Sequence, residues 1–251
     1  MREDNELLRR RFSELARRSD SQSTFTFTDF LGLAEQSTLA ACGRELGGVR
    51  TTLFGGAVGC ERVICRFGSE EELGYSVDFP IVCIKAEPKS RKFAESLTHR
   101  DYLGAIMNLG IERETVGDII LTKDATYIFA LSEIADYIIS SLSRVRHTDL
   151  ILSLTEPPEE ALYHTEQRRL QISSERLDAV IARVFSLSRD DAQGLFVKRL
   201  VFADGREIPS VSYTPKVGEV ISVRGYGRFI YRGQVGLTRK GKLNVEVEVY
   251  L

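Results

Sequence analysis

Short apolar runs and amphipathic stretches alternate between residues 79 and 154 in an order that few folds can accommodate. Apolar residues at helical spacing predict one helix after Thr98 and another after Ser132, both of which can cap a first turn. Runs rich in β-branched and aromatic residues predict strands at 79–84, 117–122, 126–131 and 150–154. The order along the chain is therefore β-α-β-β-α-β.

This order predicts the ferredoxin-like plait, an arrangement that RNA-recognition motifs also use. A recognition motif stacks bases on aromatic residues of its central strands, and here those strands offer only Tyr127 and Phe129. We therefore favour a structural or protein-docking role for this face over base stacking. At the end of the second helix, Arg144 and Arg146 are expected in the last turn, where the helix dipole favours cations.

The segments on either side of the plait predict two further parts, so that the fold class is α+β. An amphipathic helix is expected over 3–18 and a second over 29–44. The Pro157-Pro158-Glu159-Glu160 stretch is typical of a domain boundary. The expected domains are an N-terminal helical region at 1–57, a ferredoxin-like (RRM-like) domain at 58–157, and a small α+β domain at 165–251.

Composition excludes several classes of protein. No stretch of the 251 residues approaches the roughly 18 apolar residues of a membrane span, and we expect a cytoplasmic protein. The four cysteines form no C-x-x-C pair and the three histidines lie far apart, so we expect reduced thiols and no metal site. The glycine-rich stretch 54–59 lacks the pattern of a phosphate loop or a dinucleotide fold, and predicts a turn. No cofactor and no catalytic residue are expected.

Charge is divided unevenly along the chain. Residues 1–166 hold 19 Lys+Arg against 27 Asp+Glu, whereas residues 167–251 hold 15 against 9. Clustered positive charge in one domain indicates an anionic partner such as RNA, because neutralising phosphates releases counterions. A solvated charged face is the alternative.

Two short helices and a turn follow in the basic third. Ser174 is expected to cap a helix in which Asp178 is a surface salt-bridge partner. Ser188 and Asp191 form a capping box that begins a second helix. Apolar residues at i, i+3, i+4, i+7 and i+8 give the first helix a complete inner stripe: Leu177, Val180, Ile181, Val184 and Phe185.

This arrangement resembles the αL RNA-binding motif of S-four-type domains. The motifs that carry the resemblance are Ser174-x-Arg176-Leu177-Asp178, Ser188-Arg189-x-x-Ala192, Asp204-Gly205-Arg206 and Gly218-Glu219-Val220-Ile221. Where that family usually places glycine before the first strand, this chain has Arg199.

A wider resemblance covers the chain from about residue 54 to its end. It is similar to the bacterial YlmH family through Ser222–Phe229, His99–Ala105 and the pattern Leu109-Gly110-Ile111-Glu112-Arg113-Glu114-x-x-Gly117-Asp118-Ile119. The resemblance implies RNA binding and association with the ribosome, with a part in handling stalled large subunits that carry peptidyl-tRNA.

Ten polar residues of the basic third are the candidate RNA contacts. Those on or just beyond the two helices are expected to form one exposed phosphate-binding surface, so that replacing one of them changes the free energy of unfolding by less than about 0.5 kcal/mol. The candidates are Arg176, Arg189, Gln193, Lys198, Arg199, Arg224, Arg228, Arg239, Lys240 and Lys242.

The leading functional hypothesis is a non-catalytic protein that binds structured ribosomal RNA or tRNA. One alternative is an RNA-modifying enzyme with an appended S-four-type domain, although no nucleophile, carboxylate pair or cofactor loop is evident. A second alternative is a protein-interaction scaffold that docks through the acidic first two-thirds. The sequence predicts no particular oligomeric state.

Overall fold

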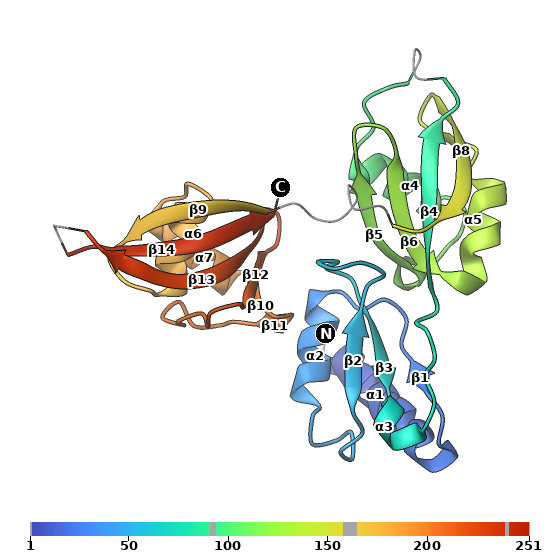
Figure 1. Cartoon of the computed structure of the whole chain (residues 1–251), viewed down its shortest axis with the longest axis horizontal. Coiled ribbons are helices and arrows are strands. Elements are labelled where there is room, and N and C mark those ends of the chain that lie inside the picture. The colour runs from blue at the N-terminus through green and yellow to red at the C-terminus, as the bar shows by residue number, and fades with distance from the viewer. Residues whose placement is uncertain (1, 91–93, 158–164, 239–240, 251) are drawn as a thin grey trace. The chain divides into compact units, whose positions relative to one another are not determined.

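The computed structural model describes residues 2–90, 94–157, 165–238 and 241–250 (Figure 1). They divide into two compact units, Met1–Glu35 with Ala41–Tyr163 and Gln36–Ala40 with His164–Leu251. Within the described ranges, no helix is both long and apolar enough to cross a membrane.

The N-terminal part of the first unit combines helices with a small sheet. Strand β3 (Ile64–Phe67) lies between β1 (Thr26–Phe27) and β2 (Thr51–Phe54), and both pairings are antiparallel. The sheet therefore continues past the expected boundary at residue 57, because β3 pairs with strands before it rather than with the plait. The helices of this part are α1 (Arg2–Gln22), α2 (Leu33–Ala41) and α3 (Glu70–Leu73).

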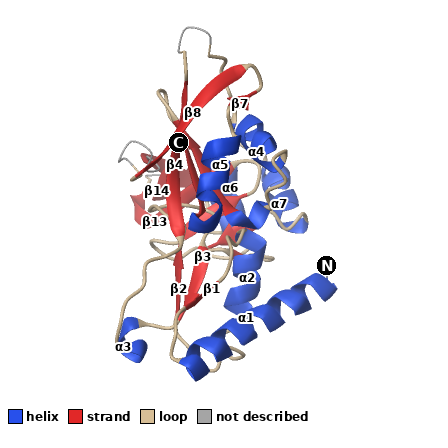
Figure 2. Ribbon diagram, turned by 90° about the vertical axis from the view of Figure 1, so that its right-hand side faces the viewer, coloured by secondary structure: helices blue, strands red, loops and turns tan. Residues whose placement is uncertain are grey.

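The plait is confirmed by the order of its strands. The sheet runs β5-β6-β4-β8 with antiparallel neighbours, and the two-residue strand β7 (Arg144–Val145) extends it beside β8. Helices α4 and α5 lie on one face of this sheet (Figure 2). The six main elements are β4 (Ile81–Pro88), α4 (His99–Met107), β5 (Val116–Leu121), β6 (Thr126–Leu131), α5 (Ala135–Ser141) and β8 (Thr148–Thr155).

The ends of the two helices differ in how well they match the sequence pattern. Thr98 is the N-cap of α4 as expected, and its backbone N–H donates to Asp101 at 2.8 Å. Ser132 instead begins a 3-10 turn, η3 (Ser132–Ile134), that precedes α5. The expectation for Arg144 and Arg146 was wrong, because α5 ends at Ser141 and the chain turns into the β7–β8 hairpin.

The face of the sheet opposite the helices is covered near Phe129. Tyr127 and Phe129 are 7 % and 1 % exposed, and they belong to a core cluster with Phe30 and Ala57. At Gly56 a Cβ atom would lie 2.4 Å from the Phe129 ring, so the expected turn at 54–59 packs directly on this aromatic side chain. Bases cannot stack on these two rings in this structure, which supports the structural role that the sequence favours.

A buried charge network joins this covering segment to the plait. The Asp118 carboxylate on β5 accepts the backbone N–H groups of Glu61 at 2.6 Å and Arg62 at 3.0 Å. The Arg62 guanidinium donates to the carbonyl oxygens of Phe30 at 2.7 Å and Val116 at 3.0 Å. Burial, and then the nearby Arg62 charge, lower the pKa of Arg113 to about 10. The motif around Arg113 and Asp118 therefore has a structural role.

The second unit packs two helices on an antiparallel sheet. The helices are α6 (Leu177–Val184) and α7 (Arg189–Val197), and the sheet order is β11-β10-β12-β13-β14-β9 (Figure 1). Arg176 rather than Ser174 is the N-cap of α6, whereas Ser188 caps α7 by accepting the Asp191 N–H at 3.1 Å. The strands are β9 (Thr165–Ile172), β10 (Val201–Ala203), β11 (Arg206–Glu207), β12 (Val220–Val223), β13 (Gly227–Leu237) and β14 (Leu243–Tyr250).

We expect residues 164–251 to fold when expressed alone. The buried residues of their core cluster all lie between Ile172 and Val249, so the apolar stripes of both helices find their partners inside the fragment. Circular dichroism and a cooperative thermal transition measure this. A fragment without cooperative unfolding would contradict the expectation.

We expect Asp118→Ala to lower the free energy of unfolding of the first unit by about 2–4 kcal/mol, because two N–H groups lose their acceptor and two half-buried arginines, Arg62 and Arg113, lose a counter-charge. Urea unfolding of the full chain measures this change. Glu133→Ala, which removes an exposed carboxylate of the same unit, is the control and is expected to change it by less than about 0.5 kcal/mol. Equal effects of the two substitutions would contradict this assignment.

Candidate nucleic-acid interface

The candidate interface is organised around a carboxylate with no exposed surface. Asp178, in the first turn of α6, is 0 % exposed and accepts hydrogen bonds from three side chains. Arg176 donates at 3.2 Å through both Nε and Nη2, and Arg189 donates at 3.0 and 3.3 Å. Gln193 donates at 3.0 Å. Asp178 is thus a salt-bridge partner as predicted, but its expected place on the helix surface was wrong because α7 covers it.

These contacts keep Asp178 charged. Burial by itself raises the pKa of this carboxyl, but the hydrogen bonds from Gln193, Arg189 and Arg176 outweigh burial and lower the pKa below its ordinary value. The side chains of Arg176 and Arg189 are 40 % and 42 % exposed. Each arginine donates to Asp178 through its Nε and Nη2 groups. Its Nη1 group is left to bind an anion from solvent.

The other end of α7 holds a second group of cations. Lys198 is the C-cap of α7 and is exposed, and within the described chain its ammonium has no ion-pair partner. Arg199 has φ +57°, the left-handed conformation that suits the glycine of the related motif, and donates to Glu207 at 2.6 Å. The Arg224 backbone N–H donates to the Leu200 carbonyl at 2.9 Å, which places the β12–β13 turn beside this helix end.

Both arginines of the β12–β13 turn rest on aromatic rings. The Arg224 guanidinium lies 5.0 Å from the centroid of Phe202, and that of Arg228 lies 4.6 Å from the centroid of Tyr250. Gly225 and Gly227 have φ of +84° and +135°, which allows the tight turn between the strands. Cation–π contact of this kind holds a guanidinium in place.

A cavity of about 540 Å³ lies beside the Asp178 cluster, and cations from three segments line it. They are Arg183 on α6, Arg189 on α7, and Lys242 before β14. Arg183 is a residue that the sequence analysis did not select, although it is exposed and outside the apolar stripe. Arg239 and Lys240 lie outside the described residues.

Six of the predicted RNA contacts lie along or beside α7. Arg176, Arg189 and Gln193 meet around Asp178, whereas Lys198, Arg199 and Arg224 lie at the C-terminal end of the helix. From Arg189 to Lys198 the helix rises by about 13 Å. The expectation of neutral effects on folding is revised for Arg176 and Arg189, because both neutralise a buried charge.

Comparison with known proteins finds a family likeness for the plait. Residues 76–158, which contain it, match the family model described as "Putative RNA-binding domain in YlmH", and this match confirms the resemblance of this part of the chain to that family. The chain is 29 % identical over 229 residues to the "Ribosome-associated protein quality control protein P2" of Bacillus subtilis (strain 168), covering 90 % of this chain and 88 % of that protein. A solved structure titled "Cell division protein ylmH from Streptococcus pneumoniae" is 18 % identical with a TM-score of 0.49, covering 61 % of this chain and 91 % of that one.

We expect Asp178→Asn to lower the free energy of unfolding of the second unit by about 2 kcal/mol at neutral pH, because the charge-assisted bonds of both arginines are lost. The pKa of Asp178 is lowered in the folded state, so its contribution is present above the unfolded pKa of about 3.9 and is lost as pH falls through the folded pKa. Urea unfolding between pH 7 and pH 3 should show the difference from wild type shrinking in acid.

The control for this measurement is Asp190→Asn, which removes an exposed carboxylate from the first turn of α7. It is expected to cost no more than about 0.5 kcal/mol. A pH-independent difference between wild type and Asp178→Asn would contradict the role assigned to the charge.

Proposed function

We propose that this protein is a non-catalytic RNA-binding protein that recognises structured ribosomal RNA or tRNA through its second unit. The observation that carries the proposal is the pair Arg176 and Arg189, which a buried carboxylate holds in fixed positions with their outer edges in solvent. Fixed cations lose little conformational entropy on binding phosphate, which favours a structured RNA with phosphates at set positions. The YlmH-type domain of the first unit supports an RNA partner.

A ribosomal setting is part of the same proposal. The relative from Bacillus subtilis is named as a ribosome-associated quality control protein and covers most of both chains. We propose a corresponding role here, on large subunits that have stalled with peptidyl-tRNA and hence in the cytoplasm.

The proposed absence of catalysis is supported by the state of the nucleophilic side chains. Cys65 and Cys83 are buried, and burial raises the pKa of each thiol to about 12, so neither forms a thiolate at neutral pH. Asp178 already accepts hydrogen bonds from three side chains and is buried, so it does not face a substrate.

We expect Lys198→Ala and Arg224→Ala each to weaken binding of an unmodified tRNA transcript and of a large-subunit RNA fragment alike. Each should reduce the slope of log affinity against log salt by about one, because each removes one phosphate contact. Fluorescence anisotropy across a salt series measures the slope, with thermal melts alongside.

The matched control is Arg232→Ala. This arginine is exposed on β13, and Glu248 already neutralises it through hydrogen bonds of 2.7 and 2.9 Å. Its slope should equal that of wild type. Unchanged slopes for Lys198→Ala and Arg224→Ala with intact folding would show that RNA does not contact the C-terminal end of α7.

A test of the ribosomal setting is cosedimentation with large subunits before and after nuclease treatment. Association that depends on intact RNA and decreases in Lys198→Ala is expected. Association that survives nuclease would assign the contact to ribosomal proteins instead.

A further inference from the structure

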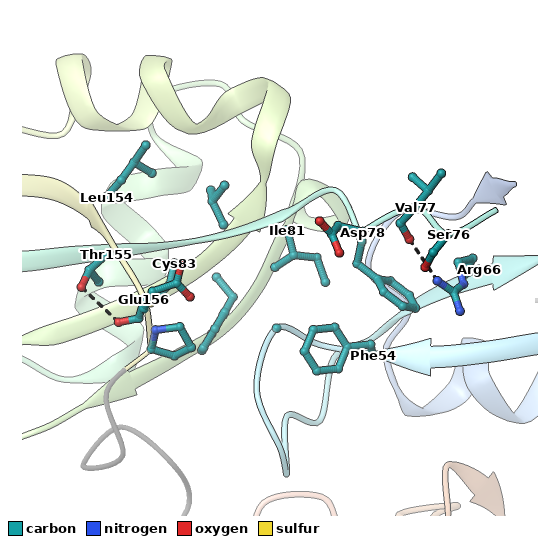
Figure 3. A pocket seen from close by; sticks show the side chains of 15 residues that line it. Phe54, Arg66, Ser76, Val77, Asp78, Ile81, Cys83, Leu154, Thr155 and Glu156 are labelled. Atoms are coloured by element: carbon teal, nitrogen blue, oxygen red, sulfur yellow. Dashed lines mark hydrogen bonds between the residues drawn. The ribbon is translucent and has the colours of Figure 1, made fainter. Parts of the chain in front are cut away.

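A second cavity lies wholly within the first unit and has a different chemistry from the basic second unit. Its volume is about 730 Å³, and its lining comes from the end of β2, the segment before β4, and the segment after β8 (Figure 3). The RNA-binding proposal does not use it.

The walls of this cavity are largely aromatic and aliphatic. The rings of Phe54 and Phe79 meet at a centroid distance of 5.3 Å, and Ile81 lies beside them. At the rim, Phe54 and Leu154 are 38 % and 55 % exposed. Exposed apolar side chains around a concave site are typical of a protein-binding surface.

Two carboxylates line this cavity at one end of the plait, where β4 begins and its antiparallel neighbour β8 ends. Asp78 precedes β4 and Glu156 follows β8, and both line the cavity (Figure 3). Across the described residues, neither side chain forms an ion pair or hydrogen bond. Burial of Cys83, and then the negative charge of Glu156, raise the pKa of the Cys83 thiol to about 12.

The one cation in the lining, Arg66, is held against aromatic rings. The Arg66 guanidinium lies over the rings of Phe25 and Phe79, at 4.9 and 5.1 Å from their centroids. Its Nη1 donates to the Val77 carbonyl at 3.0 Å. With Arg66 counted, the lining still carries one excess negative charge, in a unit that is acidic as a whole.

We propose that this cavity receives an arginine side chain from a partner protein. The guanidinium would stack on Phe54 and donate to the carboxylates of Asp78 and Glu156, in the way that Arg66 already stacks on Phe25 and Phe79. Its planar, weakly hydrated cation suits an aromatic wall better than the ammonium of lysine does. A nucleotide is disfavoured because its phosphate would approach two unpaired carboxylates. The acidic first unit would also attract a basic partner from a distance.

The test is a titration of the full chain, labelled at the methyl groups of Ile, Leu and Val, followed by NMR. The probes are the blocked tripeptides Gly-Arg-Gly and Gly-citrulline-Gly, which differ in charge but hardly in shape, and cytidine monophosphate. The arginine peptide should shift the methyl signals of Ile81 and Leu154 and bind at least fivefold more tightly than the citrulline peptide. Equal binding of the two peptides, or stronger binding of the nucleotide at the same methyl groups, would overturn the proposal.

Variants separate this site from the RNA surface. The double variant Asp78→Asn with Glu156→Gln should lose at least fivefold in affinity for the arginine peptide while its tRNA affinity stays within twofold of wild type. Glu133→Gln with Asp136→Asn removes two exposed carboxylates of the same unit outside the cavity and should change neither affinity.

If the cavity double variant does not fold, Phe54→Ala removes an exposed ring instead and should weaken peptide binding at least threefold. An equal loss in the control variant, or no loss in either cavity variant, would overturn the assignment. Because tRNA affinity is measured separately, failure here is distinguishable from failure of the RNA-binding proposal.

Discussion

The second unit depends on one buried negative charge. A carboxylate without access to solvent stays ionised only when hydrogen-bond donors surround it. The donors to Asp178 are Arg176, which precedes α6, and Arg189 and Gln193 on α7. This requirement fixes the two helices against each other and fixes both arginines in space. The surface that we propose for RNA binding is therefore a consequence of how the core is neutralised, since its central cations are the counter-ions of a core residue.

The first unit also contains a buried carboxylate, Asp118, whose hydrogen bonds join two segments. Asp118 and Arg62 tie the segment after β2 to the plait through backbone N–H and carbonyl groups. This attachment brings Gly56 onto Phe129 and closes the face that a recognition motif would use for bases. Closing that face leaves a cavity at its edge, where an aromatic wall and two carboxylates meet. We therefore propose phosphate as the ligand of the basic surface on the second unit, and a basic side chain as the ligand of the cavity in the first unit.

Sequence patterns within a few residues predicted whether most segments form helices or strands. The errors lie where contacts between distant segments decide the structure. Strand β6 and the first turns of α4 and α7 follow the sequence closely, because alternation and capping act within a few residues. The helix expected through Arg144 ends early because Arg144 pairs with Asp149 across the β7–β8 hairpin. Asp178 was placed on the surface because the apolar stripe of α6 excludes it, and nothing near it in sequence shows that α7 covers it.

The sequence by itself determined the order of elements in the plait, the caps of α4 and α7, the concentration of cations in the last third, and the candidate cations. Only the tertiary structure decided which of these cations neutralise a core charge and which, like Lys198, have no ion-pair partner among the described residues. It also buried Tyr127 and Phe129, and it brought Asp78 and Glu156 to one cavity. The physical reason is the distance along the chain over which each effect acts. Periodicity and capping depend on residues a few positions away, whereas burial and charge pairing depend on distant segments that meet only when the sheet is assembled.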